Sequence, residues 1–128
     1  MYSYNKIVSR YNRKFNGGVI MPTYNKLVRD RIPEVIENTG KKFSTRILRE
    51  TDYIVELKKK AYEELDEFAN TDNKKDAVEE LADLLEIIHA LSEYHGSSIA
   101  EVEEVRKQKA EKRGGFKEKI FLIEVEDE

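Results

Sequence analysis

The chain has 128 residues, 39% of them hydrophobic and 38% charged, which suits one domain with a single modest core. Its net charge of −3 argues against general affinity for nucleic acid, because binding to the phosphate backbone needs a basic surface. The sequence contains no cysteine, no apolar run long enough to cross a bilayer and no secretory pattern at its start. We therefore expect a cytoplasmic protein that binds neither nucleic acid nor membrane.

The first twenty residues differ in character from the rest of the sequence. Residues 3–10 are nearly repeated at 23–30, yet they are too few to form a core of their own. Two glycines precede Met21 by a few residues, and adjacent glycine codons can spell a ribosome-binding sequence. We expect residues 1–20 to be an N-terminal extension, disordered or read through from the gene's leader, and residues 21–128 to be the domain. A genuine flexible arm is the alternative.

Between the extension and the long helices, two short elements are predicted. Pro33 suits the start of a helix and Gly40 its end, which predicts a short helix over 33–39. Residues 42–49 alternate between β-branched or aromatic residues and polar ones, which predicts a strand.

Three longer helices follow. Asp52 is suited to cap the first, which we expect over 52–70, and a polar turn then leads to the second over 75–94. A capping box that begins at Ser98 opens the third helix, which two adjacent glycines end after residue 113.

The last residues predict a second strand. The apolar segment 119–125 could pair with 43–48. The predicted fold class is therefore all-α, an antiparallel helix bundle with a small two-stranded β accessory.

Two acidic pairs of the same form lie on the first two long helices. Glu64 and Glu67 are three residues apart on one helix, and Glu80 and Asp83 are three apart on the next. Each pair therefore lies on one side of a helix turn. Two antiparallel helices could bring the four carboxylates together, and a hard cation such as Mg²⁺ would offset their repulsion.

A helical wheel separates the first pair from neighbouring acids. Glu64 lies at the edge of the apolar stripe, and Glu67 lies on the same flank beside Lys60, whereas Glu63 and Asp66 point away. The inward pair is therefore Glu64 and Glu67. Taken alone, acids at this spacing are also typical of a solvated helix face.

The second pair has apolar surroundings. Glu80 and Asp83 share a helix face with Ile87 and Ala90. Burying ionised carboxylates costs several kcal/mol unless they are paired or bound to metal. A metal is the most economical partner, and salt bridges to basic residues elsewhere are the main non-catalytic explanation.

These residues resemble a known family. The E-x-x-E and E-x-x-D pairs are similar to those of the MazG-type all-α nucleoside triphosphate pyrophosphohydrolases, whose superfamily includes the phosphoribosyl-ATP pyrophosphohydrolases. A closer likeness is to a bacterial and phage branch described as phosphoribosyl-ATP pyrophosphohydrolase-like. Three segments carry that likeness, 24–33, 79–83 and 112–116. It covers residues 22–125 and does not extend to 1–20.

The resemblance implies a metal site and a reaction. The family's metal ligands fall on Glu64, Glu67, Glu80 and Asp83, with Mg²⁺ as the cofactor and Mn²⁺ as a possible substitute. The implied reaction is hydrolysis between the α and β phosphates of a nucleotide, which releases a nucleoside monophosphate and pyrophosphate. A glutamate that the metal does not saturate could orient or deprotonate the attacking water.

A phosphate-binding site also needs cations. Lys26 and Arg29 precede the first helix, and Lys112 and Arg113 end the third. Arginine can bind phosphate through two hydrogen bonds and lysine as a point charge, so we expect these four residues to bind substrate. Surface solubility and a favourable charge at a helix C-terminus are the alternative roles.

These observations lead us to expect a Mg²⁺-dependent nucleotide pyrophosphohydrolase with a house-cleaning role. One alternative is a catalytically idle helical module that binds a nucleotide or a protein, and another is the phosphoribosyl-ATP enzyme of histidine biosynthesis. The resemblance also implies a homo-oligomer, either dimer or tetramer. The second long helix is apolar around most of its girth, which is consistent with its burial against another subunit.

Overall fold

The computed structural model describes residues 14–15, 18–19 and 21–127. Its elements, in chain order, are β1 (Lys14–Phe15), β2 (Gly18–Val19), α2 (Ile32–Glu37), α3 (Glu50–Ala69), α4 (Lys74–Tyr94) and α5 (Ile99–Arg113). β1 and β2 pair as a short antiparallel ladder, and the remaining regular structure of the described residues is helical. The all-α fold class is therefore confirmed. Our expectation for residues 1–20 falls largely outside the described part of the chain.

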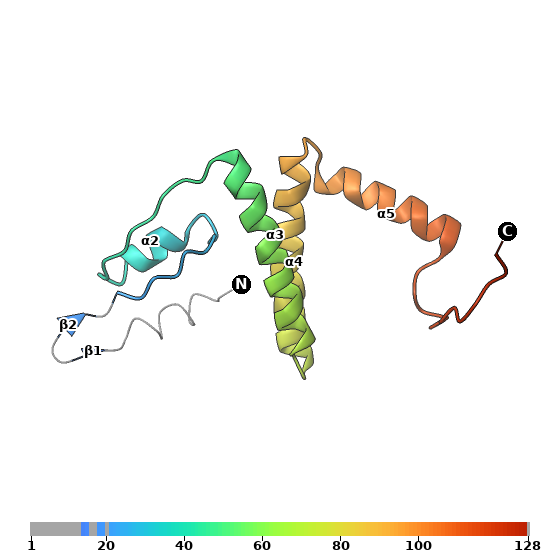
Figure 1. The fold of residues 1–128 in the computed structure, drawn as a ribbon, viewed down its shortest axis with the longest axis horizontal. Coiled ribbons are helices and arrows are strands. Elements are labelled where there is room, and N and C mark those ends of the chain that lie inside the picture. The colour runs from blue at the N-terminus through green and yellow to red at the C-terminus, as the bar shows by residue number, and fades with distance from the viewer. Residues whose placement is uncertain (1–13, 16–17, 20, 128) are drawn as a thin grey trace.

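The centre of the fold is the antiparallel pair of α3 and α4. These helices lie along each other, α2 and its flanking chain lie on the side of α3, and α5 leaves the end of α4 towards the opposite side (Figure 1). Tyr53 near the start of α3 meets Tyr94 at the end of α4 edge to face, with ring centroids 6.3 Å apart. The pairing places the acid-bearing parts of both helices at the end that contains their connecting turn.

Local hydrogen bonds fix the ends of α4 and α5. The Asn73 side chain accepts from the Asp76 amide at 2.9 Å, and the Ser98 hydroxyl accepts from the Glu101 amide at 3.2 Å. Both are N-cap bonds that satisfy amides without a partner inside the helix. Gly114 follows α5 with a φ of +80°, a conformation that glycine adopts without steric cost. The predicted polar turn is present, and the bond to the Ser98 hydroxyl supplies the N-cap half of the predicted capping box.

The predicted cap at Asp52 is wrong. Helix α3 begins at Glu50, and its N-cap position is Arg49, whose extended backbone has no side-chain cap bond. Asp52 instead lies in the first turn, where its negative charge interacts favourably with the positive end of the helix dipole. Helix α2 is present as predicted, except that it runs from Ile32 to Glu37 and not over 33–39.

The two predicted strands are not seen in the structure. Residues 42–49 and 119–125 have no regular secondary structure, and both include strongly exposed apolar side chains such as Ile47. Helix α5 carries the C-terminal segment away from residues 42–49, so the two segments do not meet (Figure 1). Lys119 also has a φ of +59°, which interrupts an extended conformation at the start of that segment.

The apolar core of the described residues is small. The buried hydrophobic side chains are Ile36, Leu57 and Ile87, one from each of α2, α3 and α4. Apolar side chains remain exposed along α4, among them Leu81 and Leu85. The expected homo-oligomer stays a prediction, and these side chains are the surface on which it would depend. No helix of the described chain has the length and apolarity that a membrane span requires.

Truncating Leu57 tests this core. Leu57 is 3% exposed and Leu65, on the same helix, is 51% exposed. We expect Leu57→Ala to lower the free energy of unfolding by about 2–5 kcal/mol, because the substitution leaves a cavity. Leu65→Ala should lower it by about 0.5 kcal/mol or less. Urea denaturation at low protein concentration measures both, and equal losses would contradict the assignment of the core.

Candidate metal centre

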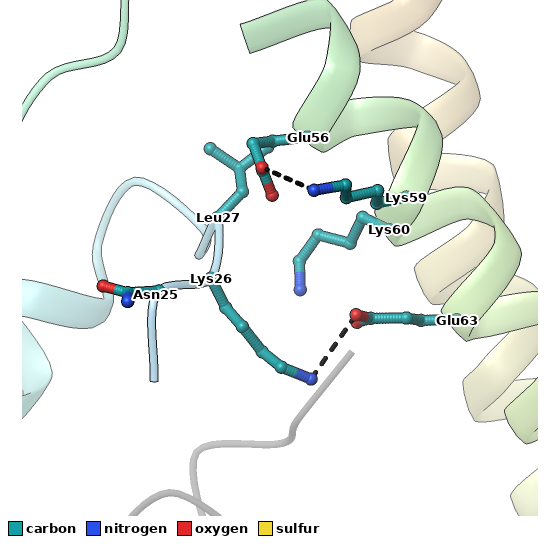
Figure 2. A pocket seen from close by; sticks show the side chains of 7 residues that line it. All are labelled: Asn25, Lys26, Leu27, Glu56, Lys59, Lys60 and Glu63. Atoms are coloured by element: carbon teal, nitrogen blue, oxygen red, sulfur yellow. Dashed lines mark hydrogen bonds and ion pairs between the residues drawn. The ribbon is translucent and has the colours of Figure 1, made fainter. Parts of the chain in front are cut away.

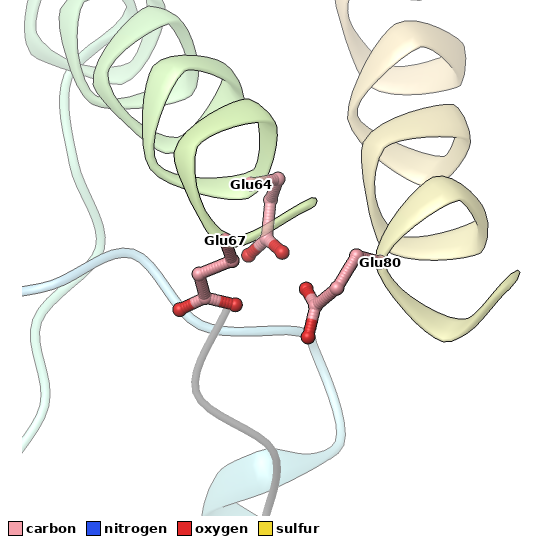
Figure 3. A group of neighbouring side chains, drawn as sticks. All are labelled: Glu64, Glu67 and Glu80. Carbon is pink, nitrogen blue, oxygen red and sulfur yellow. The ribbon is translucent and has the colours of Figure 1, made fainter. Parts of the chain in front are cut away.

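Three carboxylates from two helices converge near the turn between α3 and α4. Glu64 and Glu67 project from α3 and Glu80 from α4, and a ligand oxygen of each lies within 4.8 Å of the others (Figure 3). The spacing of three residues puts the first two on one side of α3. The antiparallel pairing then brings Glu80 opposite them. We call Glu64, Glu67 and Glu80 the carboxylate cluster.

Glu64 is the most deeply buried member of the cluster. Its exposed fraction is 0%, and it is the largest fully buried side chain of the described residues. Removing an ionised carboxylate from water costs several kcal/mol unless opposite charge or hydrogen bonds compensate for the lost hydration. The position of Glu64 therefore favours a cation, or a shared proton, among the three carboxylates.

Glu80 has a strongly altered affinity for protons. Burial, a hydrogen bond to Glu67 and the negative charge of Glu67 together raise the pKa of Glu80 to about 7. Its Oε2 atom is buried without a hydrogen bond from a described donor. At neutral pH a proton on Glu80 therefore relieves part of the repulsion within the cluster. A metal ion could replace that proton.

The cluster has the donor atoms that a hard divalent cation requires. All three side chains offer carboxylate oxygens, and Mg²⁺ takes such ligands while keeping several positions for water or phosphate oxygens. Imidazole or thiolate, which softer metals prefer, does not belong to the group. The residues present therefore fit Mg²⁺, and they fit Mn²⁺ equally well.

Asp83, the fourth predicted ligand, does not belong to the cluster. Its Oδ1 accepts a hydrogen bond of 2.6 Å from Nη2 of Arg29, which lies in the extended chain before α2. This ion pair joins a predicted metal ligand to a predicted phosphate-binding residue. The structure therefore brings together three of the four predicted carboxylates.

The other predicted cations lie in two different places. Lys26 is close to α3, where its Nζ atom lies 3.4 Å from Oε1 of Glu63. Lys112 and Arg113 are exposed at the far end of α5, which extends away from the carboxylate cluster (Figure 1). Within one chain, the fold therefore places Lys26 and Arg29 near α3 and α4, and leaves Lys112 and Arg113 apart.

Lys60 is a buried cation that the sequence analysis did not select. It is 6% exposed and precedes Glu64 by one helix turn, on the same side of α3. Burial lowers the pKa of Lys60, the charge of Glu63 opposes that effect, and repulsion from Lys26 adds to it. The sequence feature that could have identified Lys60 is its position on the helical wheel, beside Glu67 on the inward flank of the helix.

We found no match of the chain to a protein-family model, to a curated protein or to a solved structure. The likeness to the MazG-type hydrolases therefore depends on the sequence motifs themselves.

The raised pKa of Glu80 predicts a pH-dependent stability. Unfolded Glu80 ionises near its ordinary value of 4.5, whereas the folded protein retains that proton up to about 7. Between pH 4.5 and about 7 the unfolded state therefore binds fewer protons than the folded state. This contribution to the free energy of unfolding is full below pH 4.5 and is lost as the pH rises through about 7. We expect the melting temperature of the metal-free protein to fall across that range, and Glu80→Gln to flatten the dependence.

Glu79→Gln is the matched control, because Glu79 is the exposed neighbour of Glu80 on α4. Thermal denaturation in the presence of a chelator, at a series of pH values, compares the three proteins. If Glu80→Gln and the wild type lose stability in parallel, Glu80 is not the titrating group.

Proposed function

We propose that this protein is a Mg²⁺-dependent nucleotide pyrophosphohydrolase with a house-cleaning role. Its substrate would be a nucleotide cleaved between the α and β phosphates, giving a nucleoside monophosphate and pyrophosphate. The observation that carries the proposal is the carboxylate cluster, in which Glu64 is fully buried within 4.8 Å of Glu67 and Glu80. The motif resemblance, which also falls on these residues, supplies the reaction class.

Glu64, Glu67 and Glu80 would hold the metal in this proposal. Bound there, Mg²⁺ would neutralise phosphate oxygens and lower the pKa of a coordinated water. Glu67 is less buried than Glu64 and could take the proton of the attacking water. The water oxygen would bond to phosphorus as the bridge between the phosphates breaks, and pyrophosphate would leave.

The Arg29–Asp83 ion pair would have to rearrange during the cycle. Arg29 is 41% exposed at its side chain and Asp83 is 24% exposed, so a phosphate can approach the guanidinium. A phosphate bound by Arg29 would release Asp83 to become the fourth carboxylate of the site. This exchange would couple the arrival of substrate to completion of the metal site.

A catalytically idle binding module is the second candidate function. The observation that favours it is the same ion pair, because Arg29 engages the carboxylate that was predicted as the fourth metal ligand. Such a protein would bind nucleotide or a partner without turnover. The phosphoribosyl-ATP enzyme of histidine biosynthesis is a narrower version of the enzymatic proposal, and it differs only in substrate.

A panel of nucleotides distinguishes an enzyme from a binder. We expect the wild type to release pyrophosphate from at least one nucleotide with Mg²⁺ and from none with chelator. Glu64→Gln should lower the rate about a hundredfold or more, because it removes stabilisation of the transition state by the metal that is worth several kcal/mol. Each loss of about 1.4 kcal/mol lowers the rate tenfold. Asp66→Asn is the control, since Asp66 is an exposed acid on the same helix.

Absence of turnover with every nucleotide would favour the binding module. Full activity of Glu64→Gln would instead show that the reaction takes place elsewhere on the protein.

A further inference from the structure

A small pocket lies between α3 and the extended chain before α2. Its volume is about 220 Å³, below the range of about 300–1,000 Å³ typical of sites for drug-sized ligands. Five of its lining side chains are charged, namely Lys26, Lys59, Lys60, Glu56 and Glu63 (Figure 2). We call these five residues the lysine pocket. Its size suits one charged group of a ligand better than a whole nucleotide.

The charges in the lysine pocket do not balance. Lys59 Nζ pairs with Glu56 Oε1 at 3.3 Å, and Lys26 Nζ pairs with Glu63 Oε1 at 3.4 Å. Both carboxylates are therefore engaged by one lysine each. Among the described residues, no hydrogen bond or ion pair reaches the ammonium of Lys60, which Figure 2 shows pointing into the space between α3 and Lys26.

An ammonium in this position is costly unless opposite charge compensates for its burial. Lys60 is 6% exposed, so it has lost most of its hydration without gaining a close partner. Burial accordingly lowers the pKa of Lys60, the charge of Glu63 opposes this effect, and the nearby ammonium of Lys26 adds to it. A bound anion would restore the missing opposite charge. The pocket is thus arranged to gain stability from an anionic ligand.

We propose that the lysine pocket is an anion site, in which the Lys60 ammonium binds a phosphate group with Lys26 beside it. Lys60 precedes Glu64 by four residues, or about 6 Å along the helix axis. A phosphate there would lie next to the carboxylate cluster. The anion site stands on the pocket itself, and only the identity of its ligand, a phosphate of a nucleotide or of pyrophosphate, rests on the proposed function.

Titration of the full-length protein without metal tests the proposal. Pyrophosphate and a nucleoside monophosphate are titrated separately by calorimetry in the presence of chelator. We expect Lys60→Met to weaken binding of at least one of them about tenfold or more, and Lys59→Met to change it less than about twofold. Lys59 is the matched control, because it lines the same pocket and already has a carboxylate partner.

Stability separates ligand binding from a structural role. Lys60→Met should raise the melting temperature of the ligand-free protein, since an uncompensated buried charge is removed. Pyrophosphate should raise the melting temperature of the wild type and of Lys60→Arg, but not that of Lys60→Met. A lower melting temperature for ligand-free Lys60→Met, or equal anion binding by Lys60→Met and the wild type, would overturn the proposal.

The same titration distinguishes this site from the proposed reaction. Glu64→Gln should bind the anion without metal at least as tightly as the wild type does, because Glu64 does not line the pocket and the substitution removes only a nearby negative charge. Anion binding that depends on Lys60, without turnover of any nucleotide, would support the anion site and refute the proposed hydrolase activity. Turnover together with anion binding that does not depend on Lys60 would support the hydrolase activity and refute the anion site.

Discussion

Burial of the Glu64 carboxylate between α3 and α4 is the constraint on which the rest of the site depends. The helix pair has few buried apolar side chains, and it places a fully buried acid where a core residue would ordinarily lie. Such a group is tolerated only if positive charge or protons compensate for it. Glu67 and Glu80 intensify that requirement, because they add negative charge within 4.8 Å. The fold therefore concentrates negative charge at a point where a cation would bind favourably.

The charges on the two sides of this part of α3 are complementary. The carboxylate cluster concentrates negative charge, and one helix turn earlier the lysine pocket holds three cationic side chains against two carboxylates. A phosphate ester with its metal ion carries a charge complementary to each of these two sites. The two unbalanced sites therefore favour the same kind of ligand, although each was identified from different side chains. This complementarity is the physical reason for preferring phosphate chemistry to a cation site that serves only the fold.

Sequence periodicity predicted the parts of the structure that are local. The spacing of Glu64 and Glu67 and the polar turn after α3 required no knowledge of tertiary structure, and neither did the cap at Ser98. The pairing of Arg29 with Asp83 could not be predicted in this way, because it depends on where the segment before α2 lies relative to the helix pair. The prediction of strands over 42–49 and 119–125 was wrong for a related reason. Their apolar pattern is real, but α5 determines that they do not meet.

Direct binding of a divalent cation tests the central claim most closely. Mn²⁺ can be titrated into the full-length protein and followed by electron paramagnetic resonance, in which bound and free ions give different signals. We predict saturable binding that Mg²⁺ competes away and that is lost in Glu64→Gln, with Asp66→Asn binding as the wild type does. Equal Mn²⁺ binding by Glu64→Gln and the wild type, or no saturable binding at all, would contradict the assignment of the carboxylate cluster as a metal centre.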